Sequence, residues 1–258
     1  KQVPDAKGLL DIYLRDPEAS QFQNLDAVVE HKRYEEEKEL QRYQKQVRDR
    51  KDIIGKSTLG ILTIVLIGIS VVVALASEFG KNREVLNHLF ITQTKVIGSY
   101  IHWFKGLPEV QRGEIWRLFT PMFIHFGFIH LLFNMLWLKD LGTMIEKRQS
   151  PWVLAGVAFI IAMGSNLAQY AMSGPNFGGM SGVVYGLLGY VWIRGKFDPH
   201  SGLYINKETV IMMIVWFFLC LSGAMGPIAN MAHGVGLGMG VAWGYLTAQR
   251  SLHKQIRK

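Results

Sequence analysis

The sequence predicts an all-α membrane protein, a bundle of six transmembrane helices with a short fourth helix, preceded by a partial soluble N-terminal region. Two observations favour this class. The chain of 258 residues is 49% hydrophobic and only 19% charged, whereas about 25% charged residues is typical of soluble domains. Long uncharged runs recur after residue 56, and basic residues gather at their ends.

The charge distribution supports a membrane location for most of the chain. Residues 1–56 hold twelve basic and twelve acidic residues, so the net charge of +8 comes from the remainder, with sixteen basic and eight acidic residues. Because these basic residues lie where lipid headgroups are expected, we interpret them as a topology signal and not as a nucleic-acid surface. The single cysteine, Cys220, lies in an apolar run, which excludes an intrachain disulfide and disfavours a thiol nucleophile.

The N-terminal region, residues 1–56, is predicted to be the remnant of a small soluble domain followed by a linker helix. Residues 5–15 have the apolar spacing of a short helix that ends before Pro17. Residues 34–52 carry opposite charges three or four positions apart and almost no apolar face, which indicates a solvated helix.

Six apolar segments follow, each bounded by charged or helix-breaking residues. The first, residues 59–77, has nineteen residues without a charge. Its length of about 28 Å as a helix is enough to cross a hydrocarbon core of roughly 30 Å. The long connection after it, residues 78–121, is predicted to be structured or functional. The other expected spans are residues 128–146, 152–172, where Pro151 suits a helix start, 181–193, 209–221 and 227–247.

The short connections predict the orientation in the membrane. Basic residues lie between the second and third spans and between the fourth and fifth, whereas the connections after the third and fifth spans carry no charge. With further basic residues before the first span and after the sixth, both termini are expected in the cytoplasm. The expected parts are residues 1–56, a six-helix domain over 57–248, and a basic cytoplasmic tail over 249–258.

The stretch "FGGMSGVVYG" places a serine where the fourth apolar segment begins. Residues 181–193 form only about 20 Å of helix, some 10 Å too short to cross, with a basic cytoplasmic end. Ser181 is therefore expected below the outer surface. Irregular backbone would precede it, which is tolerated where it borders protein or a water-filled cavity, and Gly178, Gly179 and Gly182 permit its unusual dihedral angles.

A serine needs a base to act as a nucleophile, and the sixth span offers His233. It is expected about two turns into that span, roughly 9 Å below the outer surface. Each helix also has a glycine face, made of Gly182, Gly186 and Gly189 in the fourth span and Gly236, Gly240 and Gly244 in the sixth. Such faces let two backbones approach closely, so we predict that Ser181 and His233 touch.

Donors for a tetrahedral oxyanion are expected at the same depth. His130 and Asn134 lie four positions apart near the outer end of the second span, and the Ser181 N–H lies at a helix start. The match in depth of groups from three helices favours a hydrolytic site over the packing role that each residue would have alone. No metal site is expected, because His125 and His130 are five positions apart and would lie on different faces of a helix.

Three stretches, "WRLFTPMFIHFGFIHLLFNMLWL", "FGGMSGVVYGLLGYVWIRGKFDPHSGLY" and "ANMAHGVGLGMG", have a characteristic order and spacing. In them the chain resembles the rhomboid intramembrane serine proteases of the bacterial GlpG type over residues 57–248. The resemblance implies a rhomboid bundle and a dyad of Ser181 and His233. It also implies an oxyanion site made of His130, Asn134 and the Ser181 N–H, the residues that the depth argument reaches independently.

Further roles are implied by the resemblance alone. Tyr185 matches an aromatic ring that stacks on the histidine, with Gly179 and Met180 as supporting residues. Trp116 and Arg117 match a structural pair of the first loop, seated at the membrane interface.

For two more pairs of residues, a structural role is as well supported as the functional role that the resemblance implies. Phe133 and Trp216 match bulky residues that bound a lateral entrance for substrate, and ordinary lipid-facing packing is the alternative. Ser165 and Gln169 match a polar face that keeps water near the dyad, and interhelical hydrogen bonding is the alternative.

The implied function is an intramembrane serine endopeptidase that cleaves transmembrane segments of other membrane proteins near the outer face of the membrane. The expected partners are those helices and the lipid bilayer, without nucleic acid, metal or organic cofactor, and the oligomeric state stays open. The expected location is the bacterial inner membrane, as a multi-pass protein. One alternative is a catalytically silent rhomboid-like protein that binds membrane clients, which the retained Ser181 and His233 disfavour. Another is a transporter with a broken helix, for which no inverted repeat is apparent.

Overall fold

The computed structural model describes residues 11–16, 29–38, 59–222 and 228–256. The chain divides into two compact units, residues 1–58 and 59–258. In the first unit, residues 11–15 and 29–38 are helical. The beginning of the predicted N-terminal helix and residues 39–52 of the predicted linker helix lie outside the described residues.

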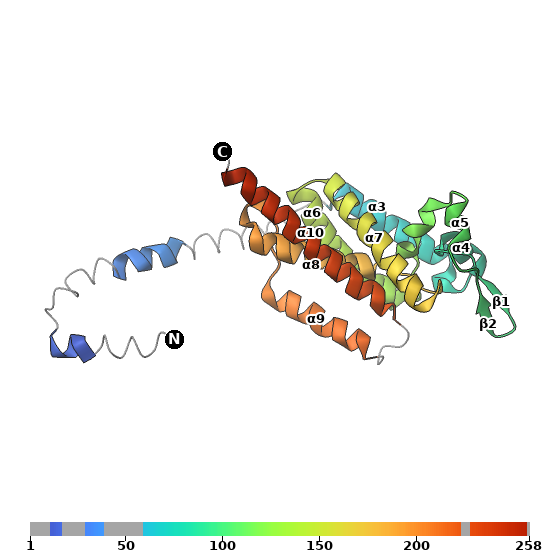
Figure 1. The fold of residues 1–258 in the computed structure, drawn as a ribbon, viewed down its shortest axis with the longest axis horizontal. Coiled ribbons are helices and arrows are strands. Elements are labelled where there is room, and N and C mark those ends of the chain that lie inside the picture. The colour runs from blue at the N-terminus through green and yellow to red at the C-terminus, as the bar shows by residue number, and fades with distance from the viewer. Residues whose placement is uncertain (1–10, 17–28, 39–58, 223–227, 257–258) are drawn as a thin grey trace. The chain divides into compact units, whose positions relative to one another are not determined.

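The second unit is mostly helical, as the sequence predicts (Figure 1). Its long helices are α3 Ile61–Ala76, α6 Phe128–Arg148, α7 Pro151–Ser173, α8 Ser181–Phe197, α9 Lys207–Leu221 and α10 Asn230–Ile256. The connection between α3 and α6 contains η2 Glu78–Gly80, α4 Arg83–Leu89, the antiparallel strands β1 Lys95–Ile97 and β2 Tyr100–His102, α5 Pro108–Gln111, η3 Ile115–Leu118 and η4 Thr120–Phe123. A short η5, Pro199–Ser201, joins α8 to α9.

Helix length and hydropathy single out one membrane span among the described residues. This helix is α7, with 23 residues, whereas α3 is apolar but has 16 residues. Pro151 begins α7 as predicted, and the Ser150 hydroxyl caps it by accepting a hydrogen bond from Val153 N at 3.1 Å. The helical fold is thus confirmed, and the six-span arrangement remains a prediction.

The predicted end of the fourth helix is wrong. α8 does not stop at Ile193 but continues to Phe197, so its 17 residues extend about 26 Å instead of 20 Å. Arg194 and Lys196 lie in its last turn, where positive charge is favourable beside the helix dipole. Arg194 Nη2 also pairs with Asp198 Oδ2 at 2.9 Å. Charged side chains therefore end the apolar part of α8 without ending the helix.

The sixth helix also differs from its predicted bounds. The predicted start at residue 227 lies outside the described residues, and α10 begins at Asn230. His233 is therefore in the first turn of the helix, not two turns along it. At its other end α10 continues to Ile256, through most of the stretch predicted to be a basic tail, because the residues after Thr247 include no glycine or proline that would stop a helix.

α8 lies at the centre of the bundle. Every residue from Gly182 to Val191 is buried, which is the pattern of a helix that is covered on all sides. The helices α6, α7 and α10 pack around it, and its interface with α10 is the most extensive between two described helices. Figure 1 shows α10 running alongside α8 and α7.

Glycine contacts hold α8 and α10 together, as predicted. A Cβ atom added to Gly236 would collide with the carbonyl oxygen of Gly182, and one added to Gly240 would collide with that of Gly186. On α8, a Cβ on Gly189 would lie 2.7 Å from Leu237 O. The two backbones thus pass each other at a distance that no other residue type permits.

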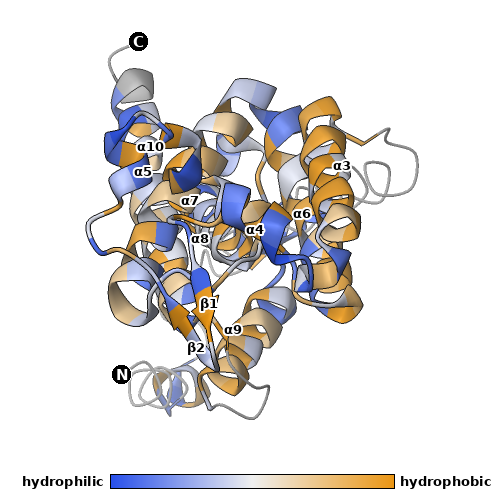
Figure 2. Ribbon diagram, turned by 90° about the vertical axis from the view of Figure 1, so that its right-hand side faces the viewer, coloured by the Kyte–Doolittle hydropathy of each residue, from blue (hydrophilic) through white to orange (hydrophobic). Residues whose placement is uncertain are grey.

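The outward surface of the second unit is apolar, most clearly on α3 and α9 (Figure 2). On α3, Ile61 and Val72 are 79% and 65% exposed, and on α9 Val215 and Phe218 are 61% and 62% exposed. The inner face of α3 carries a different stripe, Thr63, Leu66, Ser70 and Ala74, all buried. Exposed apolar surfaces of this extent are unfavourable in water and mark contact with lipid or protein.

The connection over residues 78–121 is structured, as predicted, and Arg117 is at its centre. This side chain is only 1% exposed. Its Nη1 donates hydrogen bonds to Asn87 O at 2.6 Å and Phe90 O at 2.8 Å, and its Nε pairs with Glu114 at 2.7 Å. The neighbouring Trp116 is 45% exposed. Arg117 therefore ties α4 to η3.

Glu109 is a second buried charge in this connection, and it predicts a dependence of stability on pH. Burial raises the pKa of its carboxyl. Hydrogen bonds from Thr92 Oγ1 and from backbone N–H groups, with the charge of Arg117, outweigh burial, so the pKa lies below its ordinary value of 4.5. The Thr92 bond is 2.5 Å long. The resulting stabilisation is complete above the unfolded pKa of about 4.5 and is lost as the pH falls through the lower folded value.

Glu109→Gln is accordingly expected to lower the free energy of unfolding by about 1–3 kcal/mol at pH 7, since it removes charge-assisted hydrogen bonds. The difference from the wild type should shrink as the pH falls from 5 to roughly 3. Urea unfolding at several pH values measures it. Glu84→Gln, which changes an exposed carboxylate of the same connection, is the control. A Glu109 effect that is constant over this pH range would contradict the assignment.

The glycine contacts predict a second stability effect. Gly240→Ala is expected to destabilise the protein by about 1–3 kcal/mol, because its Cβ would overpack the interface with Gly186. Gly238→Ala is the matched control on the same helix, since a Cβ there meets no atom within 4 Å. It should be neutral or stabilising by up to about 1 kcal/mol. Thermal unfolding in detergent measures both variants, and equal destabilisation would argue against close backbone packing at Gly240.

Candidate active site

Ser181 and His233 are hydrogen bonded. The distance from His233 Nε2 to Ser181 Oγ is 2.7 Å. Ser181 is the first residue of α8, and His233 lies in the first turn of α10. The glycine contacts between these helices bring the two side chains within reach, although 52 positions separate them in the sequence.

The histidine is oriented by an aromatic ring and not by a carboxylate. His233 is 4% exposed, and its Nδ1 is buried without a hydrogen-bond partner among the described residues. The Tyr185 ring lies beside the imidazole, with centroids 4.9 Å apart and an interplanar angle of 42°. The Tyr185 hydroxyl is 3.4 Å from Met213 O of α9. When Ser181 donates to Nε2, the imidazole proton is on Nδ1.

The segment that leads into Ser181 is held by backbone hydrogen bonds. Gly179 N donates to Pro121 O at 3.0 Å, and Met180 N donates to His125 Nε2 at 3.3 Å. Gly179 has a φ of +134°, a conformation that favours glycine. A Cβ atom there would lie 2.8 Å from His130 Nε2 and 3.5 Å from Ser181 Oγ. The His130 ring and the Ser181 hydroxyl therefore border the same glycine.

His130 and Asn134 share one end of α6 but differ in their contacts. The Asn134 side chain is buried, and its Nδ2 donates to His130 O at 2.8 Å within the helix. No hydrogen bond between Asn134 and Ser181 is found in the described part of the chain. An amide nitrogen carries two hydrogens, so Asn134 keeps one donor beyond this bond.

His125 is a site residue that the sequence analysis missed. Its place on the opposite face of a helix from His130 was predicted wrongly, because His125 precedes α6 and is not helical. The two imidazole centroids are 5.1 Å apart. His125 Nε2 accepts from Met180 N, so its Nδ1 donates to Phe123 O at 3.0 Å. The sequence offered one sign of this role, a second histidine five positions before His130.

Ser165 and Gln169 of α7 are both buried beside the site. Gln169 Oε1 accepts a hydrogen bond from Ala232 N at 3.0 Å, next to His233, so it caps an open N–H group at the start of α10. Ser165 Oγ donates to Ala162 O at 3.2 Å within α7. A Cβ on Gly182 would lie 3.0 Å from this hydroxyl. The interhelical hydrogen bonding that the sequence left open is present for Gln169.

Phe133 of α6 and Trp216 of α9 lie together on the surface. Their ring centroids are 5.9 Å apart, and the side chains are 47% and 43% exposed. They connect α6 and α9, two helices that otherwise have few contacts.

The arrangement has the elements of nucleophilic catalysis. A hydroxyl is hydrogen bonded to an imidazole nitrogen, and the N–H groups at the start of α8 point toward the same end of the helix as Ser181. Among the described residues, no group of three or more His, Cys, Asp or Glu side chains has a metal-binding arrangement.

The helical bundle and this Ser–His pair define a class of helical proteins with a hydrolase-like site between closely packed helices. Residues 112–250, more than half of the chain, match the profile of the Rhomboid domain. The chain therefore belongs to the rhomboid family, which confirms the resemblance seen in the sequence.

Two relatives illustrate this similarity. "Rhomboid protease GlpG" of Klebsiella pneumoniae subsp. pneumoniae is 43% identical over 140 residues, which cover 54% of this chain and 50% of that protein. The protein of the same name from Salmonella paratyphi A is 43% identical over 138 residues, or 53% of this chain and 50% of that protein. The chain spans about half the length of the curated relatives it matches.

The geometry at Gly179 predicts the effect of a small substitution. Gly179→Ala should lower the reactivity of Ser181 toward a fluorophosphonate at least tenfold, because the added Cβ combines an unfavourable φ with a collision at His130. Gly127→Ala is the control, since it has a positive φ of +100° but no atom within 4 Å of its Cβ. It should cost about 1–2 kcal/mol of stability and leave labelling nearly unchanged. Equal labelling of Gly179→Ala and the wild type would contradict the geometry.

Proposed function

We propose that this protein is an intramembrane serine endopeptidase, with Ser181 as nucleophile and His233 as general base and acid. The observation that carries the proposal is the 2.7 Å hydrogen bond between His233 Nε2 and Ser181 Oγ. It occurs in a chain of the rhomboid family, whose relatives bear the name rhomboid protease. A part-buried Ser–His hydrogen bond between two glycine-packed helices has no comparable explanation as packing.

The reaction begins when Ser181 Oγ attacks the carbonyl carbon of a peptide bond and its proton passes to His233 Nε2. The carbonyl oxygen becomes an oxyanion, for which the Ser181 N–H, His130 and the free donor of Asn134 are the proposed partners. When the C–N bond breaks, His233 gives the proton to the leaving amine. Water then attacks the acyl-enzyme with His233 as base, which releases the new carboxylate and restores Ser181.

The Tyr185 ring and Gln169 position the base in this proposal. The ring restricts the imidazole from one side, and Gln169 holds the start of α10 through Ala232 N. These contacts stand in for the carboxylate that orients the histidine in a Ser-His-Asp triad. A role for Ser165 and Gln169 in retaining water belongs to the same proposal.

The proposed substrates are transmembrane segments of other membrane proteins, which enter sideways between α6 and α9. The exposed Phe133–Trp216 pair is the proposed gate, since its separation would open the bundle toward lipid at the level of the site. Cleavage near the outer face of the membrane is part of the same proposal, because Ser181 begins α8 at the end opposite the basic residues Arg194 and Lys196.

The proposed location is the bacterial inner membrane, with six spans formed by α3 and α6 to α10 and with both termini in the cytoplasm. The apolar outward faces of α3 and α9 support this location. The basic residues at the far ends of α6 and α8 from the site support the orientation.

Substitution of the two site residues tests the proposal. Ser181→Ala and His233→Ala should each lower cleavage of a single-span model substrate at least about 10³-fold, because members of a catalytic unit act together. Ser181→Ala should also abolish fluorophosphonate labelling. Ser70→Ala is the matched control, since it removes a buried hydroxyl that donates to Leu66 O in α3, and it should retain cleavage.

Two results would contradict the proposal. Cleavage or labelling that survives in Ser181→Ala would remove this serine from the mechanism. Substrate binding without cleavage by the wild type would instead indicate a protein that only holds membrane clients.

A further inference from the structure

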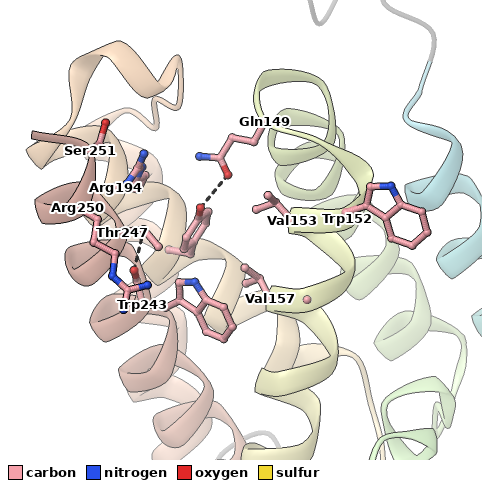
Figure 3. Close-up of a pocket in the computed structure, with 11 residues that line it drawn as sticks. Gln149, Trp152, Val153, Val157, Arg194, Trp243, Thr247, Arg250 and Ser251 are labelled. Atoms are coloured by element: carbon pink, nitrogen blue, oxygen red, sulfur yellow. Dashed lines mark hydrogen bonds between the residues drawn. The ribbon is translucent and has the colours of Figure 1, made fainter. Parts of the chain in front are cut away.

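A groove of about 460 Å³ lies between α7, α8 and α10 (Figure 3), and Ser181 and His233 are not among its lining residues. Arg194, one of its lining residues, comes thirteen positions after Ser181 in α8, which is about 20 Å along the helix axis. We call this cavity the basic groove. It is unrelated to the Ser–His pair, and it lies at the end of the bundle where the proposed topology puts the cytoplasmic leaflet.

The charge of the basic groove is positive. Its eleven lining residues include Arg194 and Arg250 and no acidic residue. Arg194 Nη2 pairs with Asp198 at 2.9 Å, but its Nε and Nη1 are buried without a hydrogen-bond partner among the described residues. Arg250 is exposed and forms no ion pair with a described side chain. Buried guanidinium donors are normally satisfied, so these two donors of Arg194 lack a partner beyond the Asp198 pair.

The opposite wall of the basic groove is apolar. Figure 3 shows Val153 and Val157 of α7 across from Arg194 of α8 and Arg250 of α10. A Cβ atom on Gly156, between these valines, would meet no atom within 4 Å, so the wall is open there. Trp152, at the start of α7, is 85% exposed, and exposed tryptophans are typical of the membrane–water interface.

We infer that the basic groove binds one anionic glycerophospholipid. Its phosphate lies at Arg194 and Arg250, because the planar guanidinium group matches phosphate oxygens in two-point hydrogen bonds. The upper part of an acyl chain lies against Val153, Gly156 and Val157. Basic pockets between membrane helices on the cytoplasmic side have the composition that recognises such headgroups. The inference rests on the membrane location in the proposed function.

Such a lipid would connect α7, α8 and α10 at one end of the bundle. The opposite ends of the same three helices contribute residues to the candidate active site. α8 carries Ser181, α10 carries His233, and α7 carries Gln169. The lipid is thus a clamp on the cytoplasmic ends of these helices, separate from the residues of the reaction.

Native mass spectrometry of the full chain in detergent, titrated with phosphatidylglycerol or phosphatidylcholine, tests the inference. The wild type should bind phosphatidylglycerol at least about fivefold more tightly, since one arginine near a headgroup contributes about 1 kcal/mol. Arg250→Gln and Gly156→Leu should each remove this preference, the first by loss of charge and the second by filling the groove. Inorganic phosphate at millimolar concentration should not displace the lipid.

Matched controls separate the groove from general effects. Lys147→Gln removes an exposed positive charge at the same end of the bundle, outside the groove. Gly68→Leu makes the same glycine change in α3, where the added Cβ also meets no atom within 4 Å. Both variants should keep the preference for phosphatidylglycerol.

Several results would overturn the inference. These are equal binding of the two lipids, an unchanged preference in both groove variants, an equal loss in Lys147→Gln, or displacement by free phosphate. The readout does not depend on proteolysis, and Ser181→Ala should bind phosphatidylglycerol like the wild type. If the wild type does not cleave a substrate but still prefers phosphatidylglycerol, the proposed function is contradicted and the lipid site is not.

Discussion

The structure depends on the direct backbone contact between α8 and α10. Gly182 and Gly186 on one helix face Gly236 and Gly240 on the other so closely that a single methyl group would collide with a carbonyl oxygen. In an apolar environment the hydrophobic effect does not drive helices together, and packing of small residues takes its place. The same contact sets the distance between Ser181 and His233, so the chemistry of the site and the stability of the bundle have one origin.

The first backbone N–H groups of each helix have no partner within the helix. Because lipid offers no hydrogen bonds, other groups of the protein must accept from them. Gln169 accepts from Ala232 N at the start of α10, and His125 accepts from Met180 N just before α8. At the far side of the bundle, Glu146 accepts from Leu62 N and Thr63 N at the start of α3, each at 2.9 Å. Side chains from other segments of the bundle thus cap helix starts, and the irregular segment before Ser181 is held in the same way.

The two ends of the bundle have different chemistry. One end holds Ser181 and His233 with the imidazoles of His125 and His130 nearby, and the other holds Arg194, Lys147 and Arg250. This division follows from the direction of α8, whose positive dipole end lies at Ser181 and whose negative end lies beside Arg194. A nucleophile and an oxyanion are favoured at the first end and cations at the second, so one helix organises both.

The sequence by itself determined the mostly helical class, without the strands β1 and β2, and the approximate positions of six long helices. It also determined the glycine faces and the pairing of Ser181 with His233, because apolar periodicity, uncharged runs and small-residue spacing are local patterns. The sequence did not predict that α8 ends at Phe197 or that α10 starts at Asn230. Charged residues mark where an apolar face ends, and a helix can continue beyond that point. Only the tertiary structure decided that His125 contacts Met180, that Gln169 caps α10 and that Asn134 bonds to its own helix. The first two contacts join segments distant in sequence, and in all three no local pattern encodes which of several polar atoms becomes the partner.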